Sequence, residues 1–414
     1  MNILHFSAGS LGGGAARGAY CLHKGLVDLG VESFFVSSGR NNPSDDRLIS
    51  LNNGVGQNLK FVALPRLGSL PKYFYVKRKP FLFSTGLEGI DITNLEAYRD
   101  ADIIHLHWIN GLLSLKTLKK IKKPVVWTIR DMWPFTGGCH YSMGCDGYTA
   151  SCGECPQLGS KSKKDLSSFV YRTKKRSLPK TIRPIGISEW ITNRANESDI
   201  FSGYPVKTIY NNIDLKSFYP EDKVLARKKL GLSESNKIVL IGANSVTDFY
   251  KGFDLFLKSL TYFSPDEFQI VTFGTAEIEL CKNIKMEVSN LGFITSDEKL
   301  RWLYSAADVF VAPSRMDAFG KTVAESMACA TPVVCFDACG PSEIVAHKTT
   351  GYKAEPFKCE DMANGINWVL NLKGESLKCI QDSSVDRVRT MFNVDVIAKQ
   401  YHSVYQDMLK FDKK

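Results

Sequence analysis

The chain has 414 residues, of which 44% are hydrophobic and 23% are charged, a composition that excludes a low-complexity chain. The length is too great for one ordinary core, so we expect two domains. Lysine and arginine number 53 against 43 acidic residues, and the net charge of +10 fits either an anionic partner or a merely basic surface. No apolar run could span a bilayer and no secretion signal is present, so we expect a cytoplasmic protein.

The first half of the chain alternates short apolar runs with helical segments. The expected strands are NILHFSA, ESFFVSSG, ADIIHLHW, KPVVWTIRD and RPIGISEW. Such runs, separated by helices, are typical of buried parallel strands. A glycine-rich turn, GSLGGGAAR, follows the first run and would let a ligand approach the backbone, although many Rossmann-like proteins have such a turn.

Two segments interrupt this pattern with basic residues. Residues 66–84 interleave aromatic side chains with Lys77, Arg78 and Lys79, and residues 161–180 hold eight basic residues and one acid. They fit either a solvated face or a surface that meets the headgroups of an anionic membrane. A nucleic acid is the rival partner, but no finger or ribonucleoprotein signature is present, so we expect none.

Four of the 11 cysteines lie within seventeen residues, in the stretch GGCHYSMGCDGYTASCGECPQLG. Four such thiolates, Cys139, Cys145, Cys152 and Cys155, suit a tetrahedral structural zinc ion, with His140 as a substitute ligand. A redox Cys-x-x-Cys pair and four unligated cysteines are the alternatives. We expect a structural zinc ion that stabilises the loop and has no catalytic role.

The pattern restarts at VKTIYNNID and continues through KIVLIGAN, FQIVTFG, MEVSNLGF, DVFVAPS and TPVVCFD, with helices at 251–261, 297–305 and 321–329. This predicts an α/β protein with two Rossmann-like, doubly wound domains, 1–205 and 206–393, that face a cleft. A last helix, 394–414, has one apolar stripe, which we expect to pack back on the first domain.

The stretch RMDAFGKTVAESMACATPVV places two acids around a Phe-Gly turn. Asp317 follows an expected strand at its carboxyl end, where ligands bind, and the turn lets a ligand approach the backbone. Lys321 and Thr322 begin a helix whose free amides attract anions. Glu325, one turn later, can accept two hydrogen bonds from ribose hydroxyls. The alternative is a charged first helical turn.

This stretch resembles the donor-binding signature of retaining GT-B glycosyltransferases of family 4, which has two glutamates separated by seven residues and Phe-Gly after the first. Asp317 replaces the first glutamate, and Ala330 stands where glycine is common. YNNIDLKSFYP, DFYKGFDLFLKSL and NLGFITSDEKLRWLYSAADVF match other segments in order. DIIHLHWING and VVWTIRDMWPFTGGCHY resemble the branch with colanic-acid-type polysaccharide transferases. The resemblance covers nearly the whole chain.

The resemblance implies catalytic roles for Lys251 on the diphosphate, for Asp317 on the donor sugar, and for Arg130, where the family often has histidine. It implies a donor site made of Gly12, Gly13, Gly14, Asn212, Phe293, Ile294, Arg315, Phe319, Gly320, Lys321, Thr322 and Glu325. The family usually has an arginine shortly before Lys251, and GANSVTD has none. Either Arg315 or Lys321 assists Lys251, or phosphate binding differs.

The resemblance further implies a retaining hexosyltransferase of bacterial cell-surface polysaccharide biosynthesis. Its donor would be a nucleotide diphosphate sugar and its acceptor a glycan, expected to be lipid-linked at the inner face of the membrane. No catalytic metal is expected. The alternatives are a sugar-nucleotide epimerase or phosphorylase on the same fold, and a basic, zinc-containing nucleic-acid-binding protein.

Overall fold

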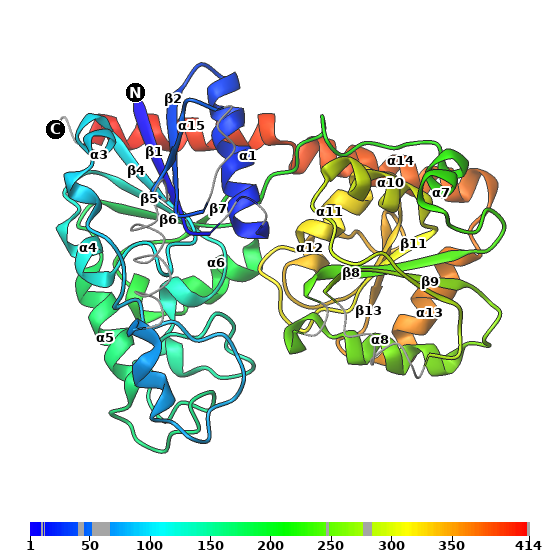
Figure 1. The fold of residues 1–414 in the computed structure, drawn as a ribbon, viewed down its shortest axis with the longest axis horizontal. Helices are drawn as coiled ribbons and strands as arrows, with labels where there is room; N and C mark the ends of the chain where they lie inside the picture. Colours follow the sequence, from blue (N-terminus) through cyan, green and yellow to red (C-terminus); the bar gives the residue numbers. More distant parts are fainter. Residues whose placement is uncertain are drawn as a thin grey trace. The chain divides into compact units, whose positions relative to one another are not determined.

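The computed structural model describes residues 1–9, 11, 13–39, 45–51, 67–245, 248–275 and 284–411 (Figure 1). The chain forms two compact units, Met1–Tyr210 with Ile397–Lys414, and Asn211–Val396. Within the described residues, every helix is too short or too polar to cross a bilayer.

The first unit is built on a seven-stranded parallel sheet in the order β3-β2-β1-β4-β5-β6-β7. The strands are β1 (Asn2–Ser7), β2 (Glu32–Ser37), β3 (Leu48–Ser50), β4 (Ile103–Leu106), β5 (Val125–Ile129), β6 (Ile182–Gly186) and β7 (Lys207–Thr208). The helices are α1 (Gly14–Asp28), α3 (Glu96–Asp100), α4 (Leu115–Lys120), α5 (Leu166–Ser177) and α6 (Glu189–Asn196).

Strand β7 corrects one expectation about the chain. The segment VKTIYNNID was assigned to the second domain, but its first residues pair with β6 through Ile185↔Lys207 and Gly186↔Thr208. The first unit therefore extends to Tyr210, beyond the expected boundary at residue 205. A two-residue edge strand is too short to be assigned to either sheet from its sequence.

The last helix, α15 (Val394–Phe411), covers the first unit with its apolar stripe. Its buried residues are Ile397, Ala398, Tyr401, Tyr405 and Met408, which share a core with Ile3, Leu22, Leu26, Val31, Ile103, Val126, Ile185 and Ile209. The helical spacing of the stripe turns all five residues to one side, so the helix buries a continuous apolar surface.

The second unit is built on a six-stranded parallel sheet in the order β10-β9-β8-β11-β12-β13. The strands are β8 (Ile238–Ser245), β9 (Gln269–Thr275), β10 (Val288–Asn290), β11 (Val309–Ala312), β12 (Val333–Phe336) and β13 (Gly351–Ala354). The helices are α7 (Lys223–Leu230), α8 (Phe253–Ser259), α10 (Asp297–Ala306), α11 (Lys321–Ala328), α12 (Pro341–Ile344), α13 (Cys359–Leu370) and α14 (Gly374–Met391).

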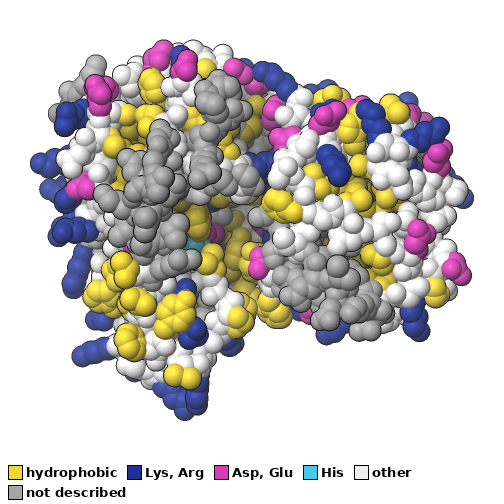
Figure 2. All heavy atoms as spheres, viewed as in Figure 1, with side chains coloured by type: hydrophobic (Ala, Val, Ile, Leu, Met, Phe, Trp, Pro, Cys, Tyr) yellow, Lys and Arg dark blue, Asp and Glu magenta, His cyan; other side chains and the backbone are white. Residues whose placement is uncertain are grey.

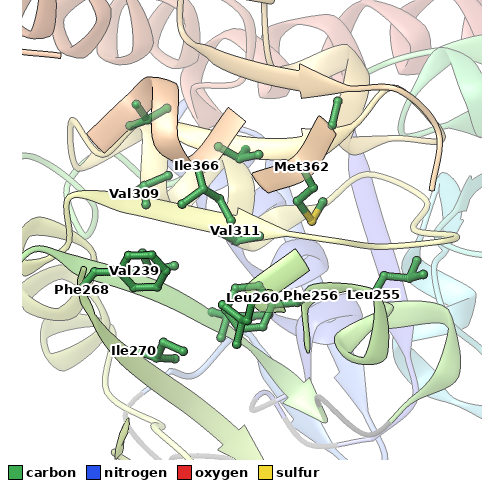
Figure 3. Close-up of a cluster of buried hydrophobic side chains, with 14 of the residues drawn as sticks. Val239, Leu255, Phe256, Leu260, Phe268, Ile270, Val309, Val311, Met362 and Ile366 are labelled. Carbon is green, nitrogen blue, oxygen red and sulfur yellow. The ribbon is translucent and has the colours of Figure 1, made fainter. Parts of the chain in front are cut away.

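The core of the second unit lies between its sheet and helices α8 and α13. Val239, Ile270, Val309 and Val311 of the strands pack with Phe256, Met362 and Ile366 of the two helices (Figure 3). All seven side chains are buried. The expectation of two parallel-sheet α/β domains is confirmed.

Each sheet reverses its strand order once, between β1 and β4 in the first unit and between β8 and β11 in the second. Ligands of open α/β sheets bind outside the carboxyl ends of the strands at such a reversal. The turns that follow β1, β4, β8 and β11 are therefore where a site is expected.

Candidate active site

Asp317 lies in the turn after β11, and its carboxylate is held from two sides. Oδ2 accepts a hydrogen bond from Lys251 Nζ at 2.7 Å. Oδ1 accepts hydrogen bonds from the backbone N–H groups of Phe319 and Gly320, at 3.2 and 3.0 Å. Both oxygens are thus engaged by the protein, and the turn orients Asp317 and Lys251 together.

The Phe-Gly turn needs glycine for two reasons. Gly320 has φ +92°, a left-handed conformation that other residues adopt only with strain, and a Cβ there would lie 2.9 Å from Pro341 Cγ. Gly340 closes the other side, since its N–H donates to Asp317 O at 3.0 Å and its own Cβ would lie 2.6 Å from Phe319 N. Gly340 is not apparent from the sequence signature, because it lies twenty residues further along the chain than Gly320.

Lys251 is brought to this turn by the glycine that follows it. Gly252 has φ +70°, and a Cβ there would lie 1.9 Å from Pro313 O, just after β11. Lys251 and Thr322 line one pocket together with residues from the carboxyl ends of β8 and β11. The predicted diphosphate ligand, Lys251, therefore lies at the strand reversal of the second sheet.

The guanidinium of Arg315 is already bound by another side chain of the same unit. It forms two hydrogen bonds to Asp254, at 2.6 and 2.7 Å, and lies 4.1 Å from the centre of the Phe249 ring. The Arg315 guanidinium holds the pKa of Asp254 below its usual value. Such a bidentate pair is geometrically specific, so the structure favours Arg315 as a clamp between the two turns rather than as a second phosphate ligand.

Glu325 is buried on α11, with 3% of its surface exposed. Oε2 accepts a hydrogen bond from Tyr304 Oη at 3.1 Å, and Oε1 forms an ion pair with Lys321, one helical turn earlier. A ribose would have to take the place of Lys321 to bind both oxygens. Tyr304 was missed from sequence because its ring belongs to the apolar face of α10, and spacing does not show where the hydroxyl points.

The other predicted donor residues are spread over the turns of both units. Phe293 is half exposed and Ile294 is buried in the turn after β10, at the carboxyl edge of the second sheet. Asn212 is buried at the start of the second unit. Gly13 and Gly14 begin α1 in the first unit, and Gly12 lies outside the described residues.

Arg130 follows β5 in the first unit, where its buried side chain contacts a histidine. Nε and Nη2 each lie 3.4 Å from His107 Nδ1. Because arginine only donates, a neutral His107 carries its proton on Nε2 and donates it to His5 Nδ1 at 2.9 Å. Burial lowers the pKa of both histidines well below the usual value, and that of Arg130 to about 10.

His105 extends this polar core toward α15. Its Nδ1 lies 2.6 Å from Tyr405 Oη and its Nε2 lies 2.7 Å from Thr128 Oγ1. Among the described residues, His5, His105 and His107 are the one group of three potential metal ligands whose atoms lie within 4.8 Å of one another. A divalent ion would, however, lie beside the buried Arg130 and would take His105 from its partners. We interpret the group as a hydrogen-bond network that positions Arg130.

The predicted zinc ligands lie elsewhere in the first unit, in the loop before α5. Cys139, Cys145, Cys152 and Cys155 line one pocket. The proposal of His140 as a substitute ligand is wrong for this structure, because its Nδ1 pairs with Asp131 Oδ2 at 2.6 Å and its Nε2 with Ser84 Oγ at 2.9 Å. Sequence spacing cannot show that a ring already has two partners.

Two family models match the chain. Residues 12–217 match Glycosyltransferase Family 4, and residues 222–384 match Glycosyl transferases group 1. The chain is 24% identical to an uncharacterised glycosyltransferase of Methanocaldococcus jannaschii, over 95% of this chain and 94% of that protein. It is 25% identical to the putative colanic acid biosynthesis glycosyl transferase WcaC of Escherichia coli, over 81% of this chain and 82% of that protein.

The fold is shared with solved structures of low sequence identity. Sucrose-phosphate synthase from Thermosynechococcus elongatus superposes with a TM-score of 0.70 at 20% identity, covering 99% of this chain and all of that one. Anabaena HepE, solved in complex with UDP-glucose, superposes with a TM-score of 0.65 at 17% identity, covering 98% of this chain and all of that one. With one family model over its first half and the other over its second, the chain belongs to the GT-B glycosyltransferases.

Proposed function

We propose that the protein is a retaining hexosyltransferase that uses a nucleotide diphosphate sugar. The observation that carries this is the turn after β11, where Lys251, Asp317 and the first residues of α11 meet at the strand reversal of the second sheet. An ammonium group and free helix amides at this position suit a diphosphate. The UDP-glucose bound by Anabaena HepE supports this class of donor.

In the proposed reaction the bond between C1 of the hexose and the diphosphate oxygen breaks, and a bond from C1 to an acceptor hydroxyl oxygen forms on the same face. The acceptor proton passes to the leaving diphosphate, so no protein base is needed. Lys251 stabilises the charge that develops on the diphosphate, and the two hydrogen bonds to Asp317 Oδ1 keep that carboxylate oriented toward Lys251. Arg130, after β5 in the first unit, is proposed as a further catalytic cation.

Glu325 is the proposed ribose ligand. Its carboxylate keeps the hydrogen bond from Tyr304 while the ribose hydroxyls replace the Lys321 ammonium. Lys321, at the first position of α11, is then released toward the diphosphate and takes the place of the arginine that the GANSVTD segment lacks. Phe293 and Ile294 are proposed to contact the base.

We propose that no metal ion takes part in the transfer, because the cations at the site are side chains and helix amides. The four cysteines are proposed to have a structural role only. Activity that depended on added magnesium or manganese would contradict this part of the proposal.

The proposed acceptor is a lipid-linked glycan of a bacterial surface polysaccharide, and the Escherichia coli relative, a putative colanic acid biosynthesis glycosyl transferase, supports a polysaccharide as the product. The first unit carries a surface suited to an anionic membrane, which we call the aromatic-basic surface. It exposes Leu67, Leu70, Tyr73, Phe74, Val76, Lys77, Arg78 and Lys79, with Lys161, Lys163 and Lys164 in the neighbouring loop (Figure 2). Phe74 is 86% and Val76 is 91% exposed, which is unusual for apolar side chains on a protein that meets only water.

The function is tested by a donor panel followed by a product analysis. One nucleotide diphosphate hexose should raise the melting temperature, since a ligand bound only by the folded state stabilises it. With a polyprenyl-diphosphate glycan as acceptor, the same donor should yield a longer glycan with the donor's anomeric configuration, seen by NMR. An inverted product contradicts retention, an epimerised sugar nucleotide indicates an epimerase, and a free sugar phosphate indicates a phosphorylase.

A further inference from the structure

We propose that Cys139, Cys145, Cys152 and Cys155 bind one structural zinc ion, and that the buried ammonium of Lys174 is its counter-cation. The four cysteines line a cavity of about 20 Å³, enough for one water-sized particle. All four are free thiols in the structure, and no carboxylate or basic side chain lines the cavity with them. Four thiols that line one small cavity are the ligand set of a tetrahedral zinc site.

Backbone N–H groups lie near two of the sulfur atoms. Burial raises the pKa values of Cys152 and Cys155, and the backbone N–H groups of Gly137 near Cys152 and of Leu158 and Gln157 near Cys155 act against that rise. Amides that point at a sulfur favour the charged thiolate, which is the form that binds a metal. These contacts act as the outer shell that orients metal ligands.

The first unit contains a buried positive charge, because the side chain of Lys174 on α5 is fully buried. Its ammonium donates to the carbonyl oxygens of Trp133 and Thr136 and lies 3.8 Å from the centre of the Trp133 ring. No carboxylate in the described ranges forms an ion pair with it. Thr136, which accepts from this ammonium, donates its hydroxyl to Cys139 O at 2.6 Å, and a Cβ on the next residue, Gly137, would lie 2.9 Å from Cys152 Sγ, so Lys174 reaches the side of the cavity formed by Cys139 and Cys152.

A buried cation without an anion is costly, so burial is normally accompanied by an opposite charge. A zinc ion with four thiolates has a net charge of −2, two positive charges against four negative ones. Such a centre would supply the negative charge that the Lys174 ammonium needs nearby, which four neutral thiols cannot do. The same two cysteines would therefore serve both as zinc ligands and as neighbours of the ammonium.

Zinc binding would draw the loop inward. As the structure places them, no three of the four sulfur atoms lie within 4.8 Å of one another, since among the described residues only the three histidines meet that distance. Tetrahedral bonds of 2.3 Å require sulfur atoms about 3.8 Å apart. Cys152 and Glu154 have left-handed φ values of 54° and 47°, so the loop turns tightly at the last two cysteines.

The loop would then hold two functional parts of the first unit. On one side Gln157 O accepts from Lys79 N at 2.7 Å, and Leu166 N donates to Tyr75 Oη at 2.9 Å, which ties the aromatic-basic surface to the loop. On the other side His140, next to Cys139, pairs with Asp131, the neighbour of Arg130. Loss of zinc is expected to loosen both parts.

The test begins with metal analysis of the full-length protein, purified without chelator after expression with added zinc. We expect one zinc per chain, lost in Cys152→Ser/Cys155→Ser and kept in Cys359→Ser/Cys379→Ser, which removes two thiols outside the cavity. Cobalt exchanged into the wild type should give the intense visible bands of a tetrahedral cobalt thiolate. Lys174→Met should weaken zinc retention against a competing chelator at least tenfold, whereas Lys174→Arg should weaken it less.

Each other result overturns a part of the proposal. No bound zinc and no cobalt thiolate spectrum in the wild type would remove the site, without any need for a variant to fold. Zinc that persists in Cys152→Ser/Cys155→Ser would assign it to other ligands, such as the three histidines. Disulfides among the four cysteines, seen by mass spectrometry of the unreduced protein, would replace the metal. Unchanged zinc retention in Lys174→Met would remove the counter-cation role.

Discussion

At the scale of single residues, Asp317 shows what a shorter acid does in the turn after β11. Its carboxylate stays close to its own backbone, where it accepts from the N–H groups of Phe319 and Gly320, and its second oxygen holds Lys251. The longer side chain of glutamate places its carboxylate one methylene further from the backbone. Asp317 is thus suited to hold Lys251 in a fixed orientation.

The first prediction concerns Lys251. Lys251→Ala should lower the rate of transfer roughly a hundredfold or more, because a fixed cation on a leaving group contributes a few kcal/mol to transition-state stabilisation. Steady-state kinetics with the donor found in the panel measure this. Lys258→Ala removes an exposed lysine from the following helix and should change the rate little. A Lys251→Ala enzyme of near-normal rate would show that another group carries the diphosphate.

The second prediction concerns Glu325. Glu325→Gln keeps the shape of the side chain and its acceptor for Tyr304 but removes the negative charge that Lys321 meets. Nucleotide affinity should fall at least tenfold while the melting temperature changes by only a few degrees. Calorimetric titration with the nucleotide measures the affinity. Unchanged affinity in a folded variant would remove Glu325 from the ribose site.

At the scale of secondary-structure elements, the first sheet has an unusual polar centre. Strands β1 and β4 bring His5 and His105 together beneath α15, whose Tyr405 completes the hydrogen bonds of His105. His23 of α1 is buried nearby against Ser33 of β2. Buried polar groups that are mostly satisfied give a sheet and its covering helices one preferred register, which here positions Arg130 after β5.

The third prediction follows from the low pKa values of this centre. Burial lowers the pKa of His23 to about 4 and takes those of His5, His105 and His107 well below the usual value. Above pH 6.5 all four are neutral in both states. Below it only the unfolded chain takes up protons, so the free energy of unfolding should fall by about 1.4 kcal/mol per pH unit for each histidine.

Urea unfolding at pH 7.5, 6.5 and 5.5 measures the free energy of unfolding. Between pH 6.5 and 5.5 the four histidines together should lower it by on the order of 5 kcal/mol. In His23→Gln the free energy of unfolding should fall less between pH 6.5 and 5.5 than in the wild type. In His402→Asn it should fall by about as much as in the wild type. A free energy of unfolding that stays constant from pH 7.5 to 5.5 would mean that the histidines are solvated.

The fourth prediction concerns the contact between α15 and β4. Tyr405→Phe removes the hydroxyl that pairs with His105 Nδ1 at 2.6 Å and leaves a buried ring nitrogen without that partner. The free energy of unfolding should fall by about 1–3 kcal/mol. Tyr262→Phe, in which the ring is 56% exposed, is the matched control and should change it by less than about 0.5 kcal/mol. Equal effects in both variants would contradict a specific role for Tyr405.

At the scale of the whole molecule, the basic residues that give the excess of ten positive charges are unevenly distributed. The aromatic-basic surface combines exposed apolar side chains with Lys77, Arg78 and Lys79, whereas Lys174 of the second basic segment is buried. Not every basic residue of 161–180 therefore contributes to a surface. Tyr75 and Phe83 also turn inward: the hydroxyl of Tyr75 accepts a hydrogen bond from the backbone N–H of Leu166, and Phe83 packs into a small core.

The fifth prediction is salt-sensitive binding to anionic liposomes. Basic residues near an anionic surface contribute about 1 kcal/mol each, so Lys77→Ser/Arg78→Ser should weaken binding about thirtyfold. Phe74→Ser/Val76→Ser should weaken it further at high salt, where only apolar contacts remain. Lys228→Ser/Lys229→Ser in α7 removes two exposed lysines elsewhere and serves as the control. Flotation measures binding, and equal recovery with neutral and anionic liposomes would contradict the proposal.

Sequence by itself determined the fold class and the signature of the second unit. Short apolar runs that alternate with helical segments are typical of parallel strands buried between helices, and the Phe-Gly turn between two acids is legible in the sequence itself. The Asp317–Glu325 stretch lies on one turn and one helix, so its arrangement follows from neighbouring residues. That is why the position of the candidate site was predictable.

Only the tertiary structure decided which partner each polar group has. Arg315 pairs with Asp254, Glu325 with Tyr304, and His107 with Arg130. These pairs join residues far apart in the chain, and the direction of a side chain at its end depends on the packing around it, which spacing does not reveal. For the same reason the buried Lys174 could not be distinguished by sequence from the solvated lysines beside it.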